Sequence, residues 1–302
     1  MEGVIQETIL PHAGAIAFFF LATLIVNGIA YFWGFYSLPG DEDPFFLDRS
    51  PLSFLKLVGV FAVFLGVNAL ITVLLRAYLL LKMGVPILKE APLEEALPPH
   101  FLGWMDLLFI LSSVSGILFY SYIWGPDTWE ALAGKQGLSV VSRGLRDFGR
   151  GILTLFICYP LIILFNEILE VFFEIFHIPA VEQAPVEKIM AVRENGALFL
   201  VTSLSVLILV PFAEEILFRG YLQTWIKQKL GRFWTIGLTS LVFALFHYAE
   251  RQGIRNIQFV GVLFIFSCFL GFIKERQQSI WAPFGLHLAF NSIALAAIYL
   301  KV

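Results

Sequence analysis

Residues 209–220 read Leu-Val-Pro-Phe-Ala-Glu-Glu-Ile-Leu-Phe-Arg-Gly, which puts two adjacent carboxylates and an arginine inside a strongly apolar run. Charges at the depth of a bilayer are costly, and they persist where they face a protein interior or a wet cavity. On a helix, Glu215 and Arg219 are i,i+4 neighbours that can pair, whereas Glu214 points about 100° away from Glu215. Pro211 removes a backbone donor and predicts a kink beside the carboxylates. These residues alone leave two interpretations open: a reactive carboxylate, or a structural ion pair that locks two helices.

The composition around this stretch is that of an integral membrane protein. Of the 302 residues, 59% are hydrophobic and only 14% are charged, and the mean hydropathy is +0.82. In soluble domains about a quarter of the residues are charged, so this chain is expected to lie in a bilayer. The net charge of −3 and the lack of a basic tract argue against nucleic acid as a partner.

We expect an all-α, polytopic membrane fold of about eight transmembrane helices, with a polar cavity in the C-terminal half. Eight apolar stretches approach or exceed the roughly 20 residues that a spanning helix needs. A linker after residue 178 divides them into an N-terminal transmembrane region, residues 1–190, and a C-terminal region, residues 191–302, of about four spans each. The predicted spans are 13–36, 53–81, 103–125, 150–175, 195–227, 233–249, 256–273 and 280–300.

The distribution of charges predicts an orientation. Lysines and arginines are more frequent in the loops that follow the odd-numbered spans, which puts these loops in the cytoplasm. Residues 135–150 carry several of them and are expected to lie along the membrane surface. Near the end of the fourth span, Asn166, Glu167, Glu170 and Glu174 share one helical face. That face indicates either a polar wall of a cavity or a second ion or substrate site.

Three further polar residues stand in the last spans: His247, His287 and Asn291, the latter two spaced i,i+4 on one helical face. At a rise of about 1.5 Å per residue, these residues and Glu214 lie roughly 16–22 Å from the nearest basic residue at the presumed cytoplasmic end. Three separate spans therefore carry polar groups to one depth in the membrane, which predicts a shared cavity.

Such a set of residues is suited to hydrolysis. A carboxylate held away from bulk water can act as a general base, and a histidine opposite it can help to polarise a water molecule. A second histidine with an asparagine offers hydrogen-bond donors to the oxyanion of a tetrahedral intermediate. No serine or cysteine has an obvious nucleophile setting beside them. The expected chemistry is attack of water on the carbonyl of a peptide or another acyl bond.

The motifs Glu214-Glu215-x-x-x-Arg219, Phe243-x-x-x-His247 and His287-x-x-x-Asn291, in this order, resemble those of the CPBP family. This family comprises the CAAX prenyl-protein proteases and the bacteriocin-processing or Abi-type enzymes, which are glutamate-dependent intramembrane endopeptidases. The resemblance covers about residues 195–295 and makes residues 191–302 a CPBP-like catalytic region.

The resemblance implies a role for each matching residue. Glu214 would activate water with the help of His247, and His287 with Asn291 would stabilise the oxyanion. Glu215 and Arg219 would support them. It also implies a membrane-associated protein or peptide, prenylated in part of the family, as substrate, and neither metal nor cofactor.

Two alternatives remain at this point. The first is a zinc-dependent membrane protease that uses Glu214, His247 and His287 as ligands, although the sequence lacks the His-Glu-x-x-His motif. The second is a non-enzymatic membrane scaffold, immunity protein or transporter with structural charges. On the leading hypothesis, the protein is a multi-pass protein, of the cell membrane in a prokaryote, whose active-site cavity faces the cytoplasm.

Overall fold

The computed structural model describes residues 10–39, 52–83, 99–125, 128–129, 132 and 141–300. Within these ranges the chain is helical and contains no strand, which confirms the predicted fold class. The elements are α2 (Leu10–Phe32), α4 (Phe54–Met83), α6 (Pro99–Ile123), α8 (Val141–Ile175), α9 (Ala184–Ala191), α10 (Gly196–Leu204), η3 (Ser205–Leu209), α11 (Val210–Glu214), η4 (Glu215–Gln223), α12 (Thr224–Lys227), α13 (Arg232–Phe246), η5 (Glu250–Arg255), α14 (Asn256–Gln277) and α15 (Trp281–Leu300).

Seven helical stretches of the described residues are long and apolar enough to cross a membrane, and the chain is an integral multi-pass membrane protein. The remaining predicted span, 233–249, is the 15-residue helix α13. At about 1.5 Å per residue, α13 extends only about 22 Å, which is less than the hydrocarbon thickness of a bilayer. Its short length has a consequence for the site, because His247 follows the last residue of α13 and so lies within the membrane rather than at its far surface.

The fourth span begins earlier than the apolar run suggests. Helix α8 starts at Val141 and continues for 35 residues, so residues 141–150 belong to a spanning helix and not to a segment on the membrane surface. Residues 135–140 lie outside the described ranges. The basic residues of this stretch, among them Arg143 and Arg150, indicated a surface segment in the sequence. In the structure Asp147 is buried, with Arg143 and Arg150 within 4 Å, so its charge is balanced inside the bundle.

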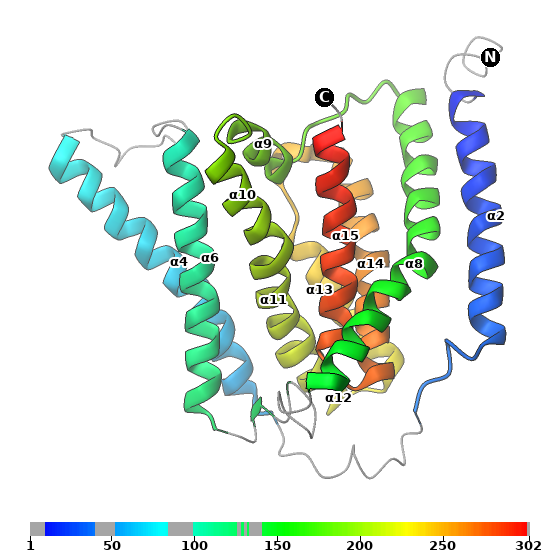
Figure 1. The fold of residues 1–302 in the computed structure, drawn as a ribbon, viewed down its shortest axis with the longest axis horizontal. Helices are drawn as coiled ribbons and strands as arrows, with labels where there is room; N and C mark the ends of the chain where they lie inside the picture. The colour runs from blue at the N-terminus through cyan, green and yellow to red at the C-terminus, as the bar shows by residue number, and fades with distance from the viewer. Residues whose placement is uncertain are drawn as a thin grey trace.

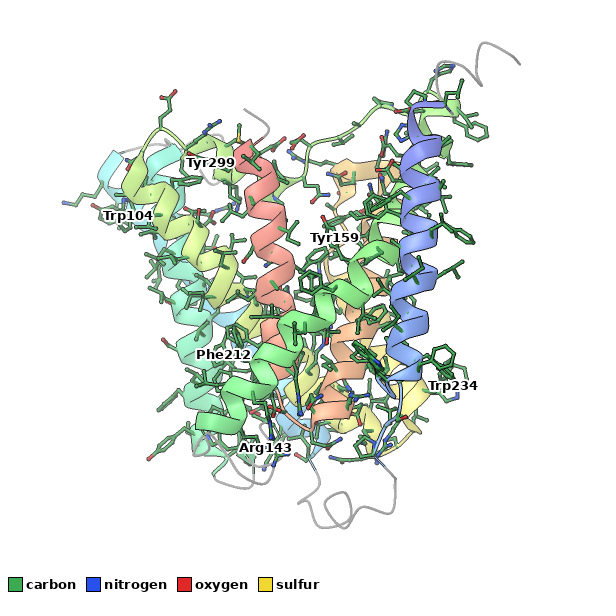
Figure 2. The ribbon with its side chains drawn as sticks, turned by 45° about the vertical axis from the view of Figure 1, so that its right-hand side comes forward. Trp104, Arg143, Tyr159, Phe212, Trp234 and Tyr299 are labelled. Carbon is green, nitrogen blue, oxygen red and sulfur yellow. The ribbon has the colours of Figure 1, made fainter. Side chains whose placement is uncertain are left out.

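Figure 1 shows three groups of helices side by side, with α4 and α6 at one edge, the segment α10–α12 with α15 in the centre, and α8 with α2 at the other edge. Helix α14 packs against α13, α8 and α15. Figure 2 shows exposed aromatic side chains towards both ends, with Trp104 and Tyr299 at one end and Trp234 at the other. Aromatic residues at both ends of a bundle are typical of the two membrane–water interfaces.

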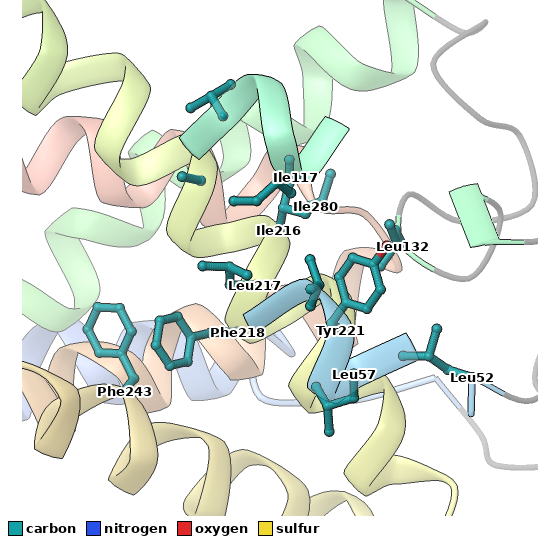
Figure 3. Close-up of a cluster of buried hydrophobic side chains, with 13 residues drawn as sticks. Leu52, Leu57, Ile117, Leu132, Ile216, Leu217, Phe218, Tyr221, Phe243 and Ile280 are labelled. Carbon is teal, nitrogen blue, oxygen red and sulfur yellow. The ribbon is translucent and has the colours of Figure 1, made fainter. Parts of the chain in front are cut away.

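One apolar core surrounds η4 and fixes it against its neighbours. Figure 3 shows Phe218 and Leu217 of η4 among side chains from α4, α6 and α13. The rings of Phe218 and Phe243 meet edge to face with centroids 5.1 Å apart. Helices in lipid associate through packing of this kind because there is no water to exclude. The core therefore holds the helix that carries the two glutamates.

The polar face of the fourth span has partners within the protein. His12 of α2 contacts Glu167 at 2.8 Å and Glu174 at 3.2 Å. Glu170 accepts a hydrogen bond from Nη1 of Arg255 at 2.7 Å. Asn166 accepts one from Nε2 of Gln258 at 3.1 Å. This face joins α8 to α2 and α14.

Helices α8 and α15 cross at a close contact made possible by glycine. A Cβ atom added to Gly285 would overlap the carbonyl oxygen of Phe148, and one added to Gly151 would overlap that of Ala282. Small residues allow such close approach of backbones between membrane helices. The crossing lies two residues before His287 and sets the position of α15.

We expect Gly285→Ala to lower the free energy of unfolding by about 1–3 kcal/mol, because the added methyl group must push the two backbones apart. Gly237→Ala in α13 is the matched control, since a Cβ there meets nothing within 4 Å. Thermal unfolding in detergent measures both. Equal midpoints for the two variants would contradict the close crossing.

Candidate active site

The segment from Gly196 to Lys227 is one continuous span in which α-helical and π-helical turns alternate. The π-helical turns are η3 and η4, and the short α-helical segment α11, which contains Pro211 and ends at Glu214, lies between them. A kink was expected at Pro211, and the helical conformation continues through this residue. A π turn includes an extra residue and so moves the preceding carbonyl away from the proline ring, which relieves the usual clash. Single π turns occur frequently at functional sites.

The carboxylate of Glu214 lies between two histidines from different helices. Its Oε1 atom is 3.4 Å from Nε2 of His247, and its Oε2 atom is 3.7 Å from Nε2 of His287. The side chain of Glu214 keeps 15% of its surface exposed and that of His247 keeps 26%. Both distances exceed the 2.7–2.9 Å of a direct charge-assisted hydrogen bond. The arrangement therefore leaves the carboxylate and His247 accessible to a small molecule such as water.

The adjacent Glu215 has different surroundings. It is fully buried, and its Oε2 atom lies 3.3 Å from Nε of the fully buried Arg219. The predicted i,i+4 pair is thus present. The guanidinium of Arg219 also donates to Oγ of Ser267 at 2.7 Å and lies 4.5 Å from the ring centroid of Phe243. A buried charge needs such partners because it has lost its hydration.

The hydrogen bond behind His247 determines its tautomer. Nδ1 lies 2.8 Å from the carbonyl oxygen of Phe243, and a carbonyl oxygen can only accept. Nδ1 therefore carries the proton. In the neutral ring, Nε2 presents a lone pair in the direction of Glu214, so both groups can accept hydrogens from one water molecule.

His287 has a carboxylate behind it instead of a carbonyl. Its Nδ1 atom lies 2.8 Å from Oε1 of Glu215, and its ring meets Phe266 edge to face. Glu215 is ion-paired with Arg219 and accepts, so Nδ1 of His287 donates. To donate from Nε2 as well, His287 must be an imidazolium, and Glu215 is the counter-charge that this imidazolium would face.

Asn291 bonds to the backbone of the span that carries Glu214 and Glu215. Its Nδ2 atom donates to the carbonyl oxygen of Val206 at 3.0 Å. In the π turn of η3, the N–H of Val210 donates to Ser205, and the next residue, Pro211, has no N–H. The carbonyl of Val206 therefore lacks both of its nearest helical donors, and Asn291 replaces them. One N–H of Asn291 is used in this contact, and the amide has a second.

The structure thus brings Glu214, His247 and His287 together and places Glu215, paired with Arg219, behind His287. Asn291, one turn after His287 on α15, instead contacts the backbone of Val206. Ser267 and Phe243 also support the site, through Arg219. Sequence reasoning missed Ser267, because a serine within an apolar run gives no signal of a partner. It named Phe243 as a position of the second motif but did not predict its contact with Arg219. Among the described residues, no group of three or more His, Cys, Asp or Glu side chains is arranged to hold a metal ion.

The fold is that of a polytopic membrane protein, and its helices bring one carboxylate and two histidines together inside the bundle. These are groups that can support hydrolysis. Residues 196–293 match the family model described as type II CAAX prenyl endopeptidase Rce1-like. No curated protein and no solved structure matches the chain.

The matched segment contains all three motifs, and this segment is similar to the CAAX prenyl endopeptidases that the family model describes. The proteins that this family model describes are peptide hydrolases, so the similarity of residues 196–293 supports a peptidase. The match lies within the region 191–302 that was predicted to be catalytic.

We expect Asn291→Leu to cost about 1–3 kcal/mol of stability, because it leaves the carbonyl of Val206 buried without a donor. The cost should be smaller in a Pro211→Ala background, where residue 211 regains an N–H. A double-mutant cycle on unfolding in mixed micelles measures the difference, expected to be at least about 0.5 kcal/mol. Identical costs in both backgrounds would show that Asn291 does not compensate for the proline.

We expect Arg219→Met to destabilise the protein by about 3–5 kcal/mol, since Glu215 would remain as a buried charge without its partner. Combining it with Glu215→Gln should recover part of that loss. Arg193→Met, which removes a cation near Tyr299 at the bundle end, is the control for removal of an arginine. If the double variant is as unstable as Arg219→Met alone, the ion pair is not what stabilises this region.

Proposed function

We propose that this protein is an intramembrane endopeptidase that hydrolyses a peptide bond of a membrane-associated substrate with water activated by Glu214. The observation that carries the proposal is the position of the Glu214 carboxylate, 3.4 Å from His247 and 3.7 Å from His287, with part of its surface exposed. A general base must lie within reach of the proton that it abstracts, directly or through one water.

His247 would hold and polarise the water together with Glu214. The hydrogen bond from Nδ1 to Phe243 leaves Nε2 as an acceptor, and the water can donate one hydrogen to this atom and the other to Oε1 of Glu214. Its oxygen lone pairs then remain free to attack. Because the water donates one hydrogen to each of these two acceptors, a histidine whose Nδ1 proton is held by a neutral carbonyl suits this position.

His287 and Asn291 would stabilise the oxyanion. As an imidazolium held by Glu215, His287 donates from Nε2, and the second N–H of Asn291 is the other donor. Glu215 and Arg219 are then positioning residues, because they act through His287 and do not touch the reacting atoms.

The reaction proceeds by two proton transfers. The water oxygen bonds to the carbonyl carbon while one water proton passes to Glu214, and the carbonyl electrons form the oxyanion. Collapse of the tetrahedral intermediate restores the carbonyl and breaks the C–N bond. The proton on Glu214 passes to the leaving amine, which regenerates the carboxylate.

The substrate class follows from the location of the site and from the family. A reacting group inside the bilayer can meet a protein or peptide that is anchored in the membrane, and the name of the matched family indicates prenylated proteins. The end of the bundle that carries Arg143, Lys227, Arg232 and Arg276 would face the cytoplasm, in line with the excess of basic residues on that side.

We expect Glu214→Gln to lower cleavage of membrane-anchored peptides in liposomes by about 10²–10⁴-fold, the usual contribution of a general base. Peptides with and without a prenyl group should be compared, each with and without a chelator. Glu187→Gln is the matched control, since Glu187 is half exposed and pairs with Arg251 outside the site.

The outcomes separate the competing hypotheses. Cleavage that resists chelator and disappears in Glu214→Gln, with unchanged thermal stability, supports the glutamate mechanism. Cleavage abolished by chelator and restored by zinc would establish a zinc protease instead. Equal cleavage by wild type and Glu214→Gln would refute the role of Glu214, and a scaffold whose charges are structural would then account for the cluster.

A further inference from the structure

A cavity of about 590 Å³ lies away from the three motifs, at the basic end of the bundle. It is enclosed by the turn after α2, the first part of α8 and the end of α14. Its volume falls in the range of ligand sites, about 300–1,000 Å³. The lining residues are Phe35, Ser37, Leu38, Pro39, Arg150, Leu153, Thr154, Ile157, Ile273, Arg276 and Gln277.

The path of α8 explains why a cavity exists here. Figure 1 shows α8 running beside α2 in its C-terminal half and diverging from α2 in its N-terminal half, and Pro160 lies inside the helix between these halves. The turn after α2 closes one side of the resulting gap. Phe35 in this turn packs on Phe272 with centroids 5.3 Å apart, and the hydroxyl of Tyr36 donates to Asn27.

Two arginines line this cavity from different helices. Arg150 of α8 is 47% exposed; its Nη1 atom donates to Gln277 at 2.7 Å and lies 3.6 Å from Asp147. Nη1 of Arg276 in α14 donates to the carbonyl oxygens of Gly34 at 2.7 Å and Ser37 at 3.3 Å. Within the described part of the chain, these bonds use one terminal nitrogen of each guanidinium and leave the other donors for a ligand.

The charge of the cavity is positive and its inner wall is apolar. The two acidic side chains described at this end, Asp147 and Glu275, are buried and already paired with basic residues. The wall below the arginines includes Ile157, Ile273 and Leu153, and Leu153 is 63% exposed on the lipid-facing surface. A ligand that fits must carry a negative head beside an apolar chain.

We propose that this cavity binds an anionic phospholipid of the cytoplasmic leaflet, with its phosphate between Arg150 and Arg276 and one acyl chain along Leu153 and Ile157. Guanidinium groups recognise phosphate oxygens through paired hydrogen bonds, and basic pockets between membrane helices on the cytoplasmic side bind anionic head groups. The lipid bridges α2, α8 and α14. This site is separate from the proposed peptidase chemistry and does not depend on it.

The test is a titration of the delipidated full-length protein in detergent with phosphatidylglycerol or phosphatidylcholine, read by native mass spectrometry. Both lipids contain a phosphate, and only the first has a net negative charge. The wild type should bind phosphatidylglycerol more tightly, and Arg150→Gln or Arg276→Gln should each weaken it about fivefold, the effect of one arginine near an anionic surface. Binding of phosphatidylcholine should not change.

Two further variants separate the site from folding and from bulk charge. Arg146→Gln removes an exposed arginine one turn from Arg150 that does not line the cavity, and it should keep the wild-type preference. Leu153→Trp keeps both arginines and obstructs the apolar wall of the cavity. It should weaken phosphatidylglycerol binding without lowering the melting temperature of the lipid-free protein.

Three results would overturn the proposal. The first is an equal affinity of the wild type for the two lipids. The second is an equal loss of binding in Arg146→Gln. The third is displacement of phosphatidylglycerol by glycerophosphoglycerol, its head group without acyl chains, which would make this a site for free phosphate esters.

Discussion

The arrangement of the site depends on one buried ion pair, between Glu215 and Arg219. Both side chains are fully buried, and charges without water must be satisfied by protein groups. Glu215 accepts a hydrogen bond from His287 of α15. Arg219 donates to Ser267 in α14 and lies over the ring of Phe243 in α13. One pair therefore contacts every helix that delivers a residue to Glu214. A displacement of any of these helices would leave a charge without a partner, so the pair fixes their mutual position more strictly than apolar packing alone.

The two adjacent glutamates have the same chemistry and opposite surroundings. Glu214 closes an α-helical turn and faces two histidines, with some of its surface exposed, whereas Glu215 opens a π-helical segment and is enclosed. The histidines repeat this contrast, since His247 has a neutral carbonyl behind it and His287 has a carboxylate. Each ring is thereby suited to a different task, the first to accepting a hydrogen bond and the second to facing negative charge. Environment, not residue type, separates the groups that can react from those that position them.

The sequence was sufficient for the helical class, most of the spans, the Glu215–Arg219 pair and the convergence of three motifs, because these depend on local periodicity and on depth in the membrane. It could not predict the contact between Glu215 and His287, since nothing in one helix indicates the rotation of another. The π turns were also missed: they depend on how Pro211 is accommodated, and the donation from Asn291 to Val206 becomes understandable only once those turns are known. The start of α8 at Val141 was hidden because the basic residues before position 150 resemble a surface segment until the pairing of Arg143 and Arg150 with the buried Asp147 is seen.

The motifs all lie after residue 195, but the support of the site does not. Helix α8, which precedes the predicted division at residues 190/191, meets α15 backbone to backbone at Gly151 and Gly285. No side chain separates the two helices there, so the position of α15, and with it His287 and Asn291, is determined by α8. The contacts of α8 with α2 through His12 and with α14 through Gln258 extend this dependence to other parts of the bundle. The first spans thus have a physical reason to exist beside the catalytic motifs: they hold in place the helix that faces Glu214.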